Sequence, residues 1–131
     1  LEGNLIQEIR KEYQPIKVSD QVMQERKEQY EKYGMKIWFP KSWPPMGDFF
    51  LDDDGRIFVM TFEKGENTNE NIFDIFNAEG IYIGKTALNI LTLGDANICV
   101  KSRNGRLYCF QEKPDGFRVF QVYSIHWETE N

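Results

Sequence analysis

Residues 49–60 read Phe-Phe-Leu-Asp-Asp-Asp-Gly-Arg-Ile-Phe-Val-Met, which is an apolar segment, a polar turn ending in Gly-Arg, and a second apolar segment. Residues 98–110, Ile-Cys-Val-Lys-Ser-Arg-Asn-Gly-Arg-Leu-Tyr-Cys-Phe, repeat this pattern. Asn104-Gly105-Arg106 stands 50 positions after Asp54-Gly55-Arg56. Because Asp-Gly and Asn-Gly supply the positive φ that a tight hairpin needs, the two stretches predict two β-hairpins.

The repeat extends beyond the hairpins. After its second strand each copy has a polar loop, residues 63–71 and 112–116, and then alternating apolar and aromatic residues, 72–76 and 119–123. Such alternation is typical of a strand with two unequal faces. A fourth strand follows in the first copy at residues 81–85. Antiparallel four-stranded meanders repeated at this spacing are typical of propeller blades.

The opening of the chain resembles the turn and fourth strand of this meander, because Glu2-Gly3 matches Glu79-Gly80. We therefore expect residues 1–131 to form one propeller-type segment that is all-β and antiparallel. Its predicted parts are a lone fourth strand of a preceding blade (1–12), a helical and aromatic insertion (13–47), a complete blade (48–88) and a last blade lacking its fourth strand (89–131).

The insertion has a different character. Ser19 or Asp20 can cap a helix, and Gly34 stands where a helix-ending residue with positive φ belongs. The expected helix carries one stripe at 3.6-residue spacing, formed by Val22, Met23, Arg26, Tyr30 and Tyr33. Residues 37–46 follow, with three prolines that disfavour helix and central strand. We expect an ordered aromatic loop there.

Two segments carry a family resemblance. Pro44-Pro45 with Phe49-Phe50, followed by the Asp-Asp-Gly-Arg turn, resembles the C-terminal third of bacterial six-bladed β-propeller proteins of the NHL and TolB-like superfamily. Residues 76–84 are similar to that family's blade ending, with Asn77 in place of the usual Asp. The resemblance implies about two of six blades and a cell-envelope, periplasmic or secreted location. It transfers no catalytic residue, because the family motif is structural.

A six-bladed ring at this spacing needs roughly 300 residues, whereas the chain has 131. Three explanations stay open: a fragment of a longer protein whose other blades complete the ring, self-assembly of several copies into a ring, or a different closed fold. The formal charge of −5 without a basic stripe argues against nucleic acid as a partner. No apolar run approaches the roughly 20 residues of a membrane span.

Three groups of residues are candidates for chemistry. Asp52-Asp53-Asp54 could offer oxygens to a cation, but the second copy lacks them, and we expect a hairpin turn without metal or cofactor. His126 is the only histidine and is expected to be structural. Cys99 and Cys109 flank the second turn; a two-residue loop would place them on opposite faces, and a three-residue loop would set them directly across from each other. We expect free thiols.

The aromatic insertion is the best functional candidate. The predicted ligand-binding loop face comprises Trp38, Phe39, Trp43 and Met46, together with Glu63 and Asn67 of the polar loop. The favoured function is non-catalytic binding or scaffolding of a protein, peptide or carbohydrate partner. The alternatives are a metal-dependent six-bladed-propeller enzyme of the lactonase or lyase type, and an assembly module that recruits its partner by strand addition.

Overall fold

The structure is a computed structural model that describes residues 3–67, 69–93 and 97–128. The chain divides into two compact units. The helical unit is residues 13–45, and the sheet unit comprises residues from 46 onward together with the N-terminal residues up to 12. Within the described ranges, no helix has the length and apolar character that a membrane crossing requires.

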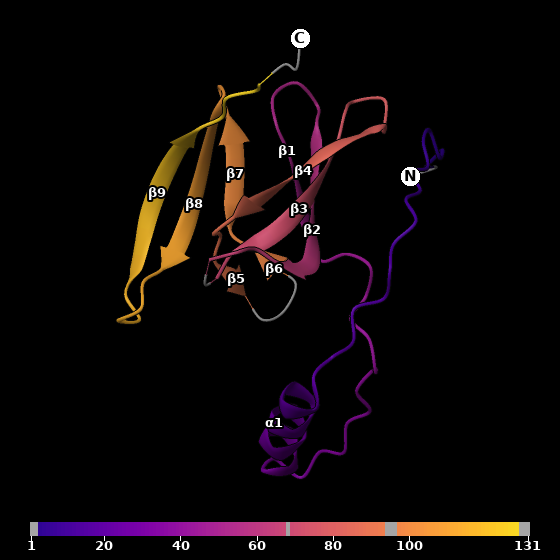
Figure 1. The fold of residues 1–131 in the computed structure, drawn as a ribbon, viewed down its shortest axis with the longest axis vertical. Coiled ribbons are helices and arrows are strands. Elements are labelled where there is room, and N and C mark those ends of the chain that lie inside the picture. Colours follow the sequence, from indigo (N-terminus) through magenta and orange to yellow (C-terminus); the bar gives the residue numbers. More distant parts are fainter. Residues whose placement is uncertain (1–2, 68, 94–96, 129–131) are drawn as a thin grey trace. The chain divides into compact units, whose positions relative to one another are not determined.

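Three antiparallel sheets form the sheet unit (Figure 1). The first is a meander in the order β1 (Phe49–Leu51), β2 (Ile57–Lys64), β3 (Asn71–Phe76) and β4 (Tyr82–Leu88). A second, two-stranded sheet pairs β5 (Thr92–Leu93) with β6 (Asn97–Ile98). The third is a meander in the order β7 (Val100–Arg103), β8 (Arg106–Glu112) and β9 (Arg118–Ser124). The predicted all-β antiparallel fold with one helical insertion is confirmed.

Two local features differ from the sequence-based expectation. The strand expected in residues 1–12 is not formed in residues 3–12, which have no regular secondary structure; residues 1–2 lie outside the described ranges. Leu5 and Ile6 are 82% and 96% exposed, so this segment does not bury the apolar residues that suggested a strand. The small β5–β6 sheet was not predicted, because runs of two residues leave no periodicity to detect.

The two hairpins use different turns. In the second, Arg103 pairs with Arg106 across a two-residue loop, and φ is +52° at Asn104 and +66° at Gly105. These values fit the type I′ turn that Asn-Gly favours. In the first, Asp52 N–H donates to the Arg56 carbonyl over 3.1 Å, which leaves a three-residue loop with Gly55 at φ +75°. Both predicted hairpins are present.

The two-residue loop settles the register of the cysteines. Val100 lies opposite Cys109, and Phe110 N–H donates to the Cys99 carbonyl over 3.5 Å. Since neighbouring positions of a strand face opposite sides of the sheet, Cys99 and Cys109 point away from each other. Both are free thiols, as predicted. Burial raises the pKa of the Cys109 thiol, so this group stays protonated at neutral pH.

One hydrophobic core joins the first and third sheets. Phe73 and Met60 of the first sheet and Cys109 of the third are at most 1% exposed. Around them lie further buried side chains from both sheets and from the chain between them: Phe50, Phe58, Ile75, Ile90 and Leu107. Phe50 stacks on Phe58 with ring centroids 4.5 Å apart. The side chains at the centre of the face shared by the two sheets are therefore buried from solvent.

Two aspartates on either side of β1 reinforce this packing. Asp48 Oδ2 accepts a hydrogen bond from Ile98 N–H over 3.1 Å, and Asp53 Oδ2 accepts one from Gly105 N–H over 3.0 Å. Both donors belong to the second repeat. Each carboxylate therefore satisfies a backbone group that strand pairing leaves open, at opposite ends of β1.

Phe73→Ala should lower the free energy of unfolding by about 3–5 kcal/mol, because it removes a fully buried ring from the centre of the core. Phe117→Ala is the matched control, since Phe117 is 72% exposed and should change stability by less than about 0.5 kcal/mol. Urea unfolding of both variants measures the difference. Equal effects would contradict the position assigned to this core.

Candidate functional site

The predicted loop-face residues fall in both units. Trp38, Phe39 and Trp43 belong to the helical unit, whereas Met46, Glu63 and Asn67 belong to the sheet unit.

The helical unit is closed by a short backbone clasp. Val18 N–H donates to the Lys41 carbonyl and Trp43 N–H donates to the Ile16 carbonyl, each over 2.9 Å. Lys17 and Ser42 form an isolated antiparallel bridge between these two bonds. Val18 is 4% exposed and is the buried apolar residue of this clasp. The clasp brings the segment before the helix beside the aromatic loop.

Helix α1 (Asp20–Glu31) begins and ends as its sequence predicts. Val22 N–H donates to the Ser19 hydroxyl over 3.2 Å, which makes Ser19 the N-cap. Gly34 has φ of +71°, and Met35 N–H donates to the Tyr30 carbonyl in the pattern of a Schellman motif. No residue of α1 is fully buried, so most of its surface remains available for contact.

A groove of about 670 Å³ lies within the helical unit, against this helix. Asp20, Met23 and Lys27 line it from one face of α1, as their spacing of three and four residues allows. The remaining lining comes from the clasp and the aromatic loop: Lys17, Val18, Ile37, Trp38, Phe39, Lys41 and Ser42. We call this surface the lysine–tryptophan groove.

The two aromatic side chains of this groove differ in exposure. Trp38 is 86% exposed, whereas Phe39 is half-buried and packs edge-on against Trp43 with ring centroids 6.1 Å apart. Phe39 and Trp43 thus stabilise the loop, and Trp38 presents its indole to solvent. Of the predicted aromatic residues, Trp38 is the one placed to contact a ligand.

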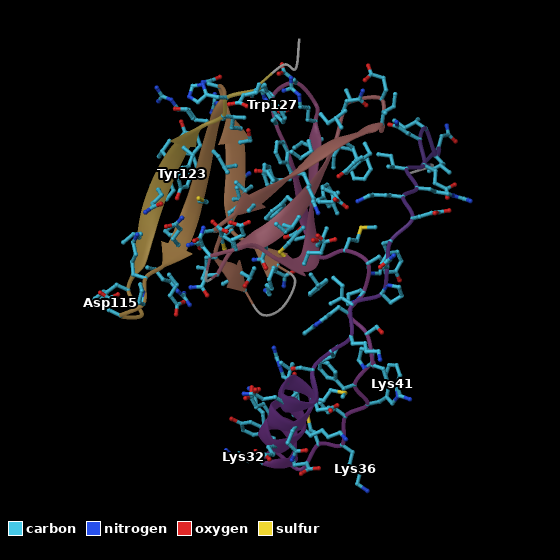
Figure 2. All side chains as sticks on the ribbon, in the orientation of Figure 1. Lys32, Lys36, Lys41, Asp115, Tyr123 and Trp127 are labelled. Carbon is cyan, nitrogen blue, oxygen red and sulfur yellow. The ribbon has the colours of Figure 1, made fainter. Side chains whose placement is uncertain are left out.

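The charge of the groove is predominantly positive. Lys17, Lys27 and Lys41 line it with a single carboxylate, Asp20. Figure 2 marks Lys41 on the loop opposite the helix, with Lys32 and Lys36 near the helix end. Residues 13–45 hold six Lys and Arg against four Asp and Glu, although the whole chain is acidic. This local excess of basic residues was a usable sequence signal that the loop-face prediction missed.

The other predicted site residues have partners within the sheet unit or are exposed. Glu63 forms an ion pair with Lys85 at 3.3 Å. Asn67 donates to the Glu70 carboxylate from its backbone and side-chain nitrogens, and these bonds lower the pKa of Glu70. Met46 is 55% exposed. Within the sheet unit, Glu63 thus links β2 to β4, and Asn67 stabilises the β2–β3 loop, of which residue 68 lies outside the described ranges.

Asp52 and Asp54 of the first hairpin bind within the turn, whereas Asp53 accepts from Gly105 N–H of the second repeat. Asp52 Oδ1 accepts from the backbone N–H groups of Asp54 and Arg56, and its Oδ2 accepts from Arg56 Nη1 over 2.9 Å. Asp54 also accepts from Arg56 Nη1, over 2.6 Å. The guanidinium of Arg56 stacks over the Trp127 ring at 4.2 Å. Within the described residues, no group of three or more His, Cys, Asp or Glu is arranged to hold a metal ion.

His126 lines a small apolar cleft of about 250 Å³ in the sheet unit. Phe50 and Phe58 of the first sheet and Trp127 of the C-terminal segment line the same cleft. Figure 2 marks Trp127 where the chain leaves β9, beyond Tyr123. Phe58 and Trp127 pack with ring centroids 5.9 Å apart. The segment that carries His126 thus holds the two sheets together at this end.

Comparison of the chain with protein-family models, with curated proteins and with solved structures finds no match.

Asp52→Ala should lower the free energy of unfolding by about 1–3 kcal/mol, because two backbone N–H groups and Arg56 lose their acceptor. Asp54→Ala is the control; the Asp54 side chain is 70% exposed and should contribute less than about 1 kcal/mol. Thermal unfolding with and without calcium chloride measures both effects. A calcium-dependent rise in melting temperature, lost on Asp52→Ala, would contradict the structural role of this turn.

Proposed function

We propose that the chain is a non-catalytic binding or scaffold protein, and that its lysine–tryptophan groove holds an acidic peptide segment of a protein partner. The observation that carries the proposal is Trp38, 86% exposed in a groove that also presents three lysines. A tryptophan with this exposure leaves a large apolar surface in water. Buried Trp residues are among the strongest single contributors to protein–protein affinity.

The chemistry of the groove favours a peptide with carboxylates around an apolar residue. Lysine ammonium groups donate hydrogen bonds and attract carboxylates, while Trp38, Met23 and Ile37 offer apolar contact. A nucleic acid would need a broad basic surface. The remainder of the chain holds ten Lys and Arg against seventeen Asp and Glu and would repel phosphates. A peptide contact is local and avoids that repulsion.

We further propose that the sheet unit is part of a β-propeller of the NHL and TolB-like kind, with further blades as its neighbours. Two consecutive antiparallel meanders that share one core support this assignment. The outer face of β8 and β9 supports it as well, because Phe110, Phe120 and Val122 are 43–57% exposed there, as on a sheet that stacks against another. The resemblance also supports a cell-envelope, periplasmic or secreted location as a proposal.

The proposed groove can be tested with a short fluorescein-labelled peptide composed of Asp, Glu, Leu and Phe. Trp38→Ala should weaken its binding about 30-fold, as expected for loss of a hot-spot residue. Lys17→Ala and Lys41→Ala should each weaken it several-fold, and more at low salt than at high salt. Fluorescence anisotropy measures these affinities, and circular dichroism checks that each variant folds.

Tyr33→Ala and Lys36→Ala are matched controls, because both residues belong to the helical unit and neither lines the groove. Their affinities should equal that of the unchanged chain. Equal binding by Trp38→Ala would contradict the proposal. So would equal binding of a peptide in which Lys replaces Asp and Glu, or tighter binding of a single-stranded oligonucleotide.

A further inference from the structure

A second cavity, of about 400 Å³, lies within the sheet unit at the ends of β2 and β8. It shares no lining residue with the lysine–tryptophan groove. Polar groups make up most of its lining. The lining residues are Lys64, Asn69, Asn71, Asn89, Ile90, Leu91, Thr92, Glu112, Lys113 and Pro114. We call it the inter-loop pocket.

The repeat places two lysines in the lining of this pocket. Lys64 ends β2 in the dipeptide Glu63-Lys64, and Lys113 follows β8 in the corresponding dipeptide Glu112-Lys113. Both lysines therefore stand where the second strand of a meander passes into its loop. Because the two sheets pack side by side in one unit, equivalent loops end beside the same pocket.

The chain between the sheets forms a fixed wall of the pocket. Gln111 is 6% exposed, and its Nε2 donates to the Asn89 carbonyl over 3.0 Å. Leu91 N–H donates to the Phe110 carbonyl over 2.8 Å. Ile90 is buried in the core. Residues 89–91 are thus held to β8 before any ligand arrives, which reduces the conformational entropy lost on binding.

Asn71 is the most buried polar residue of the lining, at 7% exposure. Its Oδ1 accepts a hydrogen bond from Lys64 Nζ over 2.8 Å, which orients both side chains. Asn69 adopts φ of +68° in the same loop. Asparagine side chains offer both donors and acceptors, as recognition of hydroxyl groups requires.

Three acidic residues at or near the pocket have partners, and one of them, Glu112, lines the pocket. Glu112 lies 3.7 Å from Arg118, and Glu63 pairs with Lys85. Glu70 accepts hydrogen bonds from Asn67. Within the lining, the two lysines Lys64 and Lys113 outnumber the single carboxylate, Glu112, although the sheet unit as a whole is acidic.

We propose that the inter-loop pocket binds a sugar-sized ligand that carries an oxyanion, with Lys64 and Lys113 on the anionic group and Asn69, Asn71 and Asn89 on its hydroxyls. The volume falls at the lower end of the range for small-molecule sites. The shared chemistry is a carboxylate or phosphate attached to a polyhydroxyl body. A uronic acid and a sugar phosphate are the two sources.

Isothermal titration of the full chain with glucuronate and with glucose 6-phosphate distinguishes the two sources. The charged sugar that binds should bind about tenfold more weakly to the Lys64→Ala and Lys113→Ala variants, because each variant loses one charged hydrogen bond. Lys101→Ala is the control, since Lys101 is exposed on β7 and does not line the pocket. Its affinity should be unchanged.

Glucose and inorganic phosphate complete the test. Both should bind more weakly than the charged sugar, because glucose lacks the anionic group and inorganic phosphate lacks the polyhydroxyl body. The proposal is overturned if neither charged sugar binds, or if Lys101→Ala weakens binding as much as the two pocket variants do. Inorganic phosphate binding as tightly as glucose 6-phosphate would overturn the role of the asparagines.

Discussion

The structure of the sheet unit depends on the packing of the four-stranded sheet against β7–β9 through Phe73, Met60 and Cys109. A sheet with one apolar face is stable only when another layer covers that face. Here the second meander covers the first, and Asp48 and Asp53 fix the backbone of the second repeat at the two ends of β1. The inter-loop pocket exists because this packing brings the corresponding loops together.

The two proposed binding surfaces differ in what holds their lining residues in place. The inter-loop pocket is bounded on one side by backbone held to a well-packed core, so the wall formed by residues 89–91 is preorganised. The lysine–tryptophan groove belongs to a small unit with Val18 as its buried apolar residue, so its surface is mostly helix and loop. Loops of this kind commonly carry binding residues. The first surface suits a small ligand, whereas the second suits an extended segment.

Much of the fold was predictable, because it depends on local chemistry. Asn104-Gly105 specifies its turn without help from distant residues, and Ser19 and Gly34 specify the two ends of the helix. Residues 3–12 could not be predicted in this way. Their match to a fourth strand is a local pattern, but a strand also needs a partner for its backbone groups. The β5–β6 sheet likewise depends on the packing around it, which the local sequence does not show.

The candidate site was predictable only in part. An aromatic loop rich in proline indicated Trp38, yet the side chains that accompany it come from the helix and the segment before it. Which of them line the groove depends on the clasp at Val18 and Lys41, a contact between distant positions. The paired lysines of the inter-loop pocket were visible in the repeat. Their convergence became apparent only from the packing of the sheets.

Native-state hydrogen exchange, read residue by residue, tests the central claim that the two meanders share one core. If they do, the slowest hydrogen-bonded amides of β3 and of β8 exchange through the same global opening, with a free energy equal to that of unfolding in denaturant. The two free energies should agree within about 0.5 kcal/mol. Exchange of β7–β9 at a much lower free energy than β1–β4 would show two independent sheets and would contradict it.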